Sequence, residues 1–539
     1  MLVPEGQVLQ GPRSTLSAGP DPLPDLVTVR TIADLIRWAA DTHGTRIAWT
    51  FVNSVDGGPT QEWSFAAVHR AVQAVAGRVS ELTTDTARVA LLLPNTPAFP
   101  LCWLGAAHAG RISVPINSAA QVADTAHVLR DSGASLVITT PERREMVAQS
   151  CEQVEHQVRI LTTTELATAL TAGTDDDAPR ESVPHNSQRI VNIQYTSGTT
   201  GMPKGCMLSH TYWLEIARSL CEGFPGVGSG DVLYTAQPFS YIDPQWNAIT
   251  ALMAGARLVI DDKFSASRMW TTMRANGVTL FYCLGIMPAA LLAQPDHPDD
   301  RKHRVRAVLA SGIPGTMHAE LERRWGVPWF EAFGMTESGA DLAVTPRDHD
   351  DVVGRACIGR PHRGREAVVL SPEGNVLRAG QEGQLAIRGV GTMDGYWGRP
   401  DETDAIFRDG WLHTGDKVVQ DEKGRFFYLG RYKEVIRRSG ENISPREVEA
   451  VLESHPAVQV AAVIAEPDEL RGQEIKAFVV LRQQTDLVEL RSHCVHRLAP
   501  FKVPRYWAVR QSLPMTPSER VARAVLAADL GPVWDSSHG

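Results

Sequence analysis

The residues from Tyr195 to Gly205 have the types and spacing needed to hold a polyphosphate. The segment reads YTSGTTGMPKG and follows the apolar, strand-like run Arg189–Tyr195. Its glycines let backbone N–H groups converge on an anion, its hydroxyls add donors, and Lys204 adds a positive charge. The spacing differs from the P-loop, which needs Gly, four residues and then Gly-Lys-Ser/Thr. A flexible loop is the alternative interpretation, but the closing Pro-Lys-Gly favours a phosphate loop.

Three later segments have chemistry that fits this loop. FGMTES offers an aromatic face for a base and Glu337 as a magnesium ligand near phosphates. WLHTGD ends at Asp416, an acceptor for ribose hydroxyls, and GRYKEVIRRSGENISPREVE begins at Gly430 with Arg431 next to it. Each segment alone also fits a helix cap, a turn or a solvated basic face. Their order and gaps together favour a nucleotide site.

Length and composition exclude several classes of protein. A chain of 539 residues should divide into two or more domains. The net charge of −9 and pI near 6.0 argue against a nucleic-acid-binding protein. Prolines interrupt the most apolar stretch, and the N-terminus lacks a signal-peptide pattern, so we expect no membrane span. The scattered cysteines predict buried thiols in a cytoplasmic protein.

Alternating helix-like and strand-like runs predict an α/β fold. Helices are expected at Ile32–Asp41, Phe65–Leu82 and Ala123–Ser132, and strands at Arg88–Leu93, Ser135–Thr139, Arg257–Ile260, Val278–Tyr282, Val305–Ala310 and Pro328–Ala332. A compact αβ unit is expected at Glu447–Glu453, Val458–Ile464 and Ile475–Leu481. We predict a flexible segment at 1–27, an AMP-binding domain at 28–430 and a C-terminal domain at 431–539.

Together the motifs resemble the adenylate-forming (ANL) superfamily from about residue 28 onward, in its acyl-CoA synthetase branch. FSYIDPQ, DKFSASRMW and GENISPREVE are most similar to carnitine- and medium-chain acyl-CoA ligases. The resemblance implies a large N-terminal domain of two α/β subdomains plus a distorted β-barrel, and a small mobile α+β C-terminal domain. In that family a carboxylic acid and ATP give acyl-AMP and pyrophosphate. The C-terminal domain then rotates about one hinge residue, and a thiol displaces AMP.

The resemblance also implies roles for individual residues. AMP or ATP would be bound by Thr196, Ser197, Gly198, Thr199, Thr200, Lys204, Gly312, Glu331, Ala332, Phe333, Gly334, Met335, Thr336, Asp416 and Arg431. Glu337 would hold Mg²⁺ if ATP is used, Lys433 would be the hinge, and Gly440 would line the pantetheine tunnel. The acyl pocket would comprise Tyr241, Ile242, Trp246, Gly285 and Ile286, with Gly312 beside it, which suggests a bulky apolar acid. CoA is the expected acceptor because no carrier-protein serine motif follows.

The family's last motif, Pro-x-Thr-x-Ser-Gly-Lys, is altered in this chain. The segment reads LPMTPSERVAR, so Glu519-Arg520 replaces Gly-Lys. In the family this lysine bridges the substrate carboxylate and the α-phosphate during adenylation. The planar fork of Arg520 cannot replace a compact ammonium there, and Glu519 adds negative charge. Loss of one well-placed electrostatic stabiliser costs ~10²–10³ in rate.

We therefore predict that thioester formation is kept while adenylation is weak or lost. The chain then resembles the non-adenylating acyl-CoA ligases of platensimycin- and platencin-type antibiotic pathways, which would need a separate adenylating enzyme. There are two smaller departures from the family pattern. Tyr241 stands where many relatives have a pocket-gating histidine, and Arg437 stands where relatives often have lysine. Two alternatives stay open: a complete ATP-dependent acyl-CoA synthetase, and a non-catalytic acyl-adenylate-binding protein.

Overall fold

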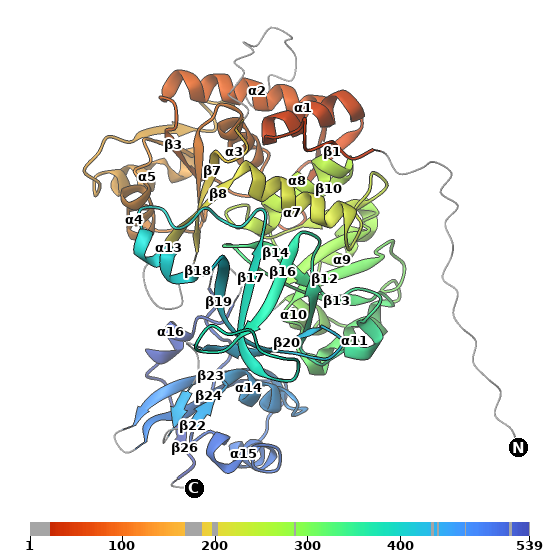
Figure 1. Ribbon diagram of the computed structural model, residues 1–539, viewed down its shortest axis with the longest axis vertical. Helices are drawn as coiled ribbons and strands as arrows, with labels where there is room; N and C mark the ends of the chain where they lie inside the picture. The colour runs from red at the N-terminus through yellow and green to blue at the C-terminus, as the bar shows by residue number, and fades with distance from the viewer. Residues whose placement is uncertain are drawn as a thin grey trace, which may run out of the picture.

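Three β-sheets organise the chain, one in each of three parts (Figure 1). The computed structural model describes residues 22–167, 186–196, 203–284, 287–432, 436–438, 441–468, 471–516 and 520–537. Within these residues no helix is both long and apolar enough to cross a membrane.

The first part is a six-stranded sheet covered by helices. Its strand order is β6-β5-β3-β4-β7-β8, parallel except for the antiparallel pair β7 and β8. The strands are β3 (Arg88–Leu92), β4 (Ile112–Ile116), β5 (Leu136–Thr139), β6 (Arg159–Thr162), β7 (Ile190–Thr196) and β8 (Lys204–Ser209). The helices that alternate with them are α2 (Phe65–Leu82), α3 (Ala98–His108), α4 (Val122–Ser132) and α5 (Arg144–Cys151), with a 3₁₀ turn at Pro141–Arg143.

The second part is a mixed sheet that continues into an antiparallel region. Its parallel strands are β1 (Ile47–Val52), β9 (Val232–Thr235), β10 (Arg257–Asp261), β11 (Leu280–Leu284), β12 (Ala307–Ser311) and β13 (Trp329–Met335), and β2 (Gln61–Ser64) is an antiparallel edge. The antiparallel region comprises β14 (Gly339–Ala343), β15 (Cys357–Pro361), β16 (Arg365–Leu370), β17 (Glu382–Gly389), β18 (Phe407–Arg408), β19 (Trp411–Gln420) and β20 (Phe426–Arg431). Helices of this part are α1 (Ile32–His43), α7 (His210–Glu222), α8 (Ile242–Ala254), α9 (Met269–Asn276), α10 (Met287–Leu292), α11 (Gly315–Trp325), α12 (His349–Val352) and α13 (Pro400–Ile406).

The C-terminal unit forms a separate lobe, drawn in blue in Figure 1. Its sheet has the order β22-β21-β24-β25-β26, and β23 pairs with β24. The strands are β21 (Ile436–Arg438), β22 (Glu441–Ile443), β23 (Val458–Asp468), β24 (Gly472–Leu481), β25 (Tyr506–Val509) and β26 (Trp534–Asp535). They pack with α14 (Pro445–Glu453), α15 (Leu487–Val495), a 3₁₀ turn at Pro500–Lys502 and α16 (Arg523–Ala527).

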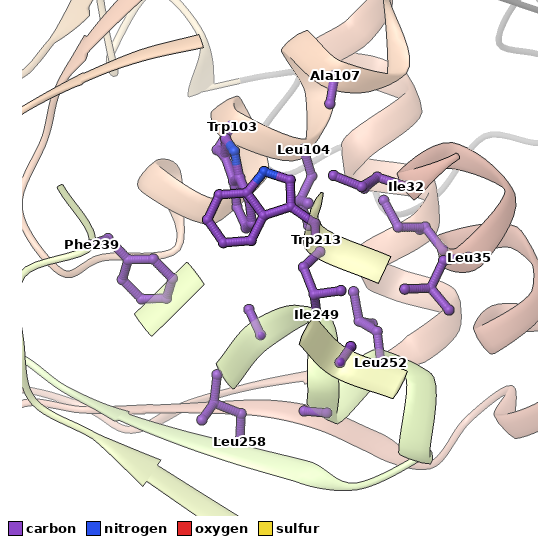
Figure 2. Packing of buried hydrophobic residues seen from close by; sticks show 14 of the residues in the cluster. Ile32, Leu35, Trp103, Leu104, Ala107, Trp213, Phe239, Ile249, Leu252 and Leu258 are labelled. Atoms are coloured by element: carbon purple, nitrogen blue, oxygen red, sulfur yellow. The ribbon is translucent and has the colours of Figure 1, made fainter. Parts of the chain in front are cut away.

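The core between the first two parts is built on two tryptophans. The rings of Trp103 and Trp213 meet edge to face with centroids 5.2 Å apart, and Figure 2 shows them among aliphatic side chains. Trp103 donates to Asn192 (2.8 Å), which donates to Gln245 (2.9 Å). Trp103, Trp213, Asn192 and Gln245 are all buried. The two hydrogen bonds therefore satisfy polar groups that would otherwise be costly to bury. The network ties α3, β7 and α8 together.

The expected α/β fold class, with a large N-terminal part and a small C-terminal one, is confirmed. The helix predicted at Phe65–Leu82 has these bounds, and Ser64 caps it by accepting from the backbone N–H of Ala67 (3.1 Å). The predicted strands lie within a few residues of β3, β5 and β10 to β13. The segment expected to form the distorted barrel, β14 to β20, consists of antiparallel strands, and the pairings among its described residues form an open path. All the cysteines are free thiols, and five of the seven are buried.

Close packing of α3 on α2 gives a testable prediction about stability. A Cβ added at Gly105 would lie 2.6 Å from Cγ1 of Val75 and 3.3 Å from the backbone N of Ala76. Gly105→Ala should therefore lower the free energy of unfolding by ~1–3 kcal/mol through overpacking. Gly77→Ala, in a helical position with nothing within 4 Å of the new Cβ, should raise it by ~0.5–1 kcal/mol. Urea unfolding followed by circular dichroism measures both, and equal effects would contradict the packing argument.

Candidate functional site

The predicted phosphate loop joins two antiparallel strands. Thr196 ends β7 and Lys204 begins β8, and the two residues are partners in the register. The intervening Ser197, Gly198, Thr199 and Thr200 lie outside the described residues. A hairpin is thus the scaffold that carries Lys204 to the edge of the sheet.

The side chain of Lys204 contacts two groups from a distant segment. Its Nζ lies 2.8 Å from Oε2 of Glu402 and 4.4 Å from the ring centroid of Tyr396. The hydroxyl of Tyr396 donates to Oε1 of Glu337 (2.8 Å). Burial and the nearby Glu337 raise the pKa of Tyr396, so its hydroxyl stays protonated as a donor. Tyr396 therefore contacts both Lys204, the predicted phosphate lysine, and Glu337, the predicted metal ligand.

The predicted adenine and α-phosphate segment runs along the end of β13. Gly334 lies so close to the next strand that an added Cβ would be 2.1 Å from the carbonyl oxygen of Gly339. Only glycine fits there, which explains its place in FGMTES. Tyr212 donates to the carbonyl oxygen of Thr336 (3.0 Å) and fixes the turn after the strand. Phe333 and Met335 are half-buried, and Phe333 packs on the core of the antiparallel strands.

Glu331 is engaged with the protein backbone. Its carboxylate accepts from the N–H groups of Gly312 (2.5 Å) and Ile313 (3.0 Å). Burial raises the pKa of Glu331 to about 7, although these two N–H groups lower it. Ser311 donates to the carbonyl oxygen of Ala332 (2.5 Å). Glu331 and Ala332 thus hold the turn at Gly312 against β13.

The predicted ribose residues form a cross-strand ion pair. Asp416 on β19 and Arg431 on β20 are register partners, and Nε of Arg431 lies 2.9 Å from Oδ1 of Asp416. Tyr428 donates to the same oxygen (3.3 Å). Asp416 is only 1 % exposed, and its Oδ2 is buried without a hydrogen-bond partner. This oxygen fits a hydroxyl donor supplied by a ligand, which is the chemistry of a ribose.

The predicted acyl-pocket residues that the structure describes lie at the start of α8. Tyr241 is the N-cap residue, and its hydroxyl accepts from Nδ2 of Asn117 (3.1 Å). Trp246, one turn further on, meets the ring of Tyr282 edge to face with centroids 5.4 Å apart. Tyr241, Ile242, Trp246 and Tyr282 all keep partial exposure. Gly285 and Ile286 lie outside the described residues.

Arg520, in the C-terminal unit, influences this site through its charge. Its N–H donates to Oγ1 of Thr516 (3.1 Å), and Thr516 N–H donates to the carbonyl oxygen of Arg520 (2.6 Å). Its positive charge lowers the pKa values of Asp416, Asp243 and Tyr282, which burial raises. The charge of Arg520 thus acts on both the ribose pair and the acyl pocket, while its own side chain is exposed.

The remaining predicted residues cannot be placed. Lys433, Gly440 and Glu519, and the side chain of Arg437, lie outside what the structure describes.

The sequence analysis missed three side chains of the site. Tyr396 and Tyr282 carry no sequence signal, because their roles depend on strands packed from distant segments. Asp243 had a weak signal, since it lies two residues after Tyr241 and one helical turn before Trp246.

The chain is similar to known CoA ligases in sequence and to solved structures in fold. The chain is 31% identical over 484 residues to the crotonobetaine/carnitine–CoA ligase of Salmonella arizonae, covering 86% of this chain and 93% of that one. It is similar in structure to ATP-bound MatB from Rhodopseudomonas palustris, with a TM-score of 0.82, 26% identity, and 92% and 98% of the two chains covered. The o-succinylbenzoate CoA synthetase of Bacillus subtilis, solved with its acyl-adenylate intermediate, has a TM-score of 0.80 at 26% identity over 91% and 97% of the chains.

Two family models match the chain. Residues 447–520 match the AMP-binding enzyme C-terminal domain, and residues 36–397 match the AMP-binding enzyme model. The match at residues 36–397 covers well over half of the chain and contains Lys204, Glu337 and the acyl-pocket residues. The protein therefore belongs to the AMP-binding enzyme family.

Proposed function

We propose that this protein forms an acyl-CoA thioester from an acyl-adenylate and CoA, with its own ATP-dependent adenylation weak or lost. The acid is bulky and apolar, and a separate enzyme supplies its adenylate, as in the platensimycin-type ligases that the sequence resembles. Family membership and relatives named as CoA ligases support the thioester-forming activity. ATP and Mg²⁺, the latter on Glu337, are needed only if adenylation is retained.

The AMP half of the substrate has suitable partners in the described residues. Oδ2 of Asp416 is a buried acceptor for a ribose hydroxyl, and Lys204 supplies positive charge for the phosphate. Phe333, at the end of β13, offers an aromatic face beside the adenine. These groups bind the nucleotide whether it arrives as ATP or as a finished adenylate.

The observation that carries the proposal is Glu519-Arg520 in place of Gly-Lys. In the structure the charge of Arg520 acts on the buried carboxylate of Asp416 and on the partly exposed carboxylate of Asp243. A guanidinium attracted to these carboxylates is less available to bridge a substrate carboxylate and a phosphate. Its planar fork is also wider than an ammonium, so it competes with the acid for space.

Thioester formation makes no comparable demand on Arg520. The CoA sulfur bonds to the acyl carbon, the bond from that carbon to the AMP oxygen breaks, AMP leaves, and the thiol proton passes to water. Lys204 and Asp416 hold the departing AMP during this step. The Gly440 loop and the Lys433 hinge, retained in the sequence, are what this half-reaction requires.

The first prediction concerns nucleotide binding. Asp416→Asn removes a charged acceptor, so AMP affinity should fall ~10–100-fold. Asp421→Asn is the matched control: Asp421 pairs with Arg425 just beyond the same two strands, at 2.8 Å, and its loss should leave the affinity within ~2-fold. Isothermal titration calorimetry measures both. If Asp416→Asn bound AMP as tightly as wild-type protein does, Asp416 would not be a ribose-binding residue.

The second prediction separates the half-reactions. Purified protein with ATP and a panel of acids should release pyrophosphate at least ~10²-fold more slowly than it converts synthetic acyl-AMP and CoA to thioester. Comparable rates would instead identify a complete acyl-CoA synthetase. Bound acyl-AMP that CoA fails to consume would identify a non-catalytic binding protein.

The third prediction tests the altered turn directly. Arg520→Lys combined with Glu519→Gly should raise pyrophosphate release ~10²–10³-fold, because it returns a compact ammonium and a flexible backbone. Arg523→Lys is the control, since Arg523 pairs with Glu449 (2.6 Å) in the same segment. If the double variant stays inactive in this assay, Tyr241 and Arg437 are the next residues to exchange.

A further inference from the structure

The charge of the predicted phosphate lysine is paired within the protein. Nζ of Lys204 lies 2.8 Å from Oε2 of Glu402 on α13, and 4.4 Å from the ring centroid of Tyr396. The side chain of Lys204 is 28% exposed and that of Glu402 is 43% exposed, so solvent and ligands reach the pair. A phosphate that binds Lys204 must therefore share the charge of this lysine with a carboxylate.

Further charged groups hold Glu402 beside the lysine. Arg399, the N-cap residue of α13, lies 3.3 Å from Oε1 of Glu402 and 3.0 Å from Oδ1 of Asp131 on α4. The hydroxyl of Tyr195 on β7 donates to Oδ2 of the same aspartate (2.6 Å). A single exposed ion pair contributes little, but several charges in one network fix each other's positions.

This network spans the hairpin that carries the phosphate loop. Lys204 begins β8, and Tyr195 lies near the end of β7, where its register partner is Gly205. The contacts run from β7 through α4 and α13 to β8, and Figure 1 shows α13 beside α4. Glu402 is thus attached to both strands that lead into the loop, and its pairing with Lys204 belongs to the structure of the phosphate site.

The network leaves no excess of positive charge for a phosphate. Its cations, Lys204 and Arg399, are matched by as many anions, Glu402 and Asp131. The hydrogen bond from Lys204 lowers the pKa of Glu402, so this carboxylate is charged at neutral pH. ATP and pyrophosphate carry several negative charges, whereas the phosphate of an acyl-adenylate carries one. Because repulsion grows with ligand charge, Glu402 disfavours a polyphosphate more than an adenylate.

We infer that Glu402 is a specificity-determining residue that, by pairing with Lys204, favours the singly charged phosphate of a finished adenylate over ATP and pyrophosphate. This inference rests on the proposed function. It adds a reason for weak use of ATP that lies in the N-terminal parts and is independent of Arg520. A site for a finished adenylate needs less positive charge than one that must hold a triphosphate.

The experiment compares three adenosine ligands of rising negative charge by isothermal titration calorimetry. The probes are adenosine 5′-methyl phosphate, AMP and ATP, without Mg²⁺, which would otherwise mask phosphate charge. Glu402→Gln should raise the affinity for ATP relative to the methyl phosphate ~3–10-fold, with AMP between them. Glu402→Ala should move the same ratio in the same direction, and because this side chain is partly exposed both variants should fold.

Asp404→Asn is the matched control, since Asp404 is an exposed acid on the same helix. It should leave the affinity ratio within ~2-fold of wild type. An unchanged ratio in both Glu402 variants, or an equal change in Asp404→Asn, would overturn the inference. An equal gain for all three ligands would overturn it as well, because it would show an effect on the shared adenosine and not on phosphate charge.

A double-mutant cycle tests whether Glu402 acts through the lysine. In a Lys204→Met background, the effect of Glu402→Gln on the affinity ratio should shrink at least ~2-fold. An undiminished effect would show that Glu402 acts without Lys204 and would overturn the inference. These titrations need no turnover, so failure of the proposed function has a different signature: no thioester from acyl-AMP and CoA, or rapid pyrophosphate release from acid and ATP.

Discussion

The site depends on a single buried carboxylate that is paired with one arginine and influenced by the charge of a second. Asp416 is paired with Arg431 on the neighbouring strand, and the charge of Arg520 acts on it from the C-terminal unit. A buried charge without such partners would be strongly unfavourable. β20 ends at Arg431, so the Asp416–Arg431 ion pair lies where the chain passes into the C-terminal unit.

A buried polar network links the two halves of the proposed site. Gln194, near the end of β7, donates to the carbonyl oxygen of Ser240 (2.5 Å), and Gln245 donates to Gln194 (3.3 Å). The strand that leads to the phosphate loop is thereby joined to the start of the acyl-pocket helix α8. Since every member of this network is buried, a shift of either element would leave polar atoms unsatisfied. The strand before the phosphate loop and the acyl-pocket helix are therefore held in a fixed relation to each other.

The proposed specialisation requires change at only two neighbouring residues. The residues proposed to bind AMP lie in the N-terminal parts, whereas Glu519-Arg520 lies in the C-terminal unit. The side chain of Arg520 is exposed, so a change there need not disturb the core. Adenylation, which depends on precise electrostatic placement at these residues, would be lost first.

The sequence by itself determined the elements and the chemical types: the bounds of α2, the glycine-rich segment, the acid Asp416 and Glu519-Arg520 in place of Gly-Lys. These follow from local periodicity and from motif spacing, which nearby residues carry. Only the tertiary structure placed Tyr396 between Lys204 and Glu337 and turned Glu331 toward the backbone of Gly312. The physical reason is that these contacts join segments far apart in the chain. They depend on strand order and side-chain packing, which no local pattern encodes.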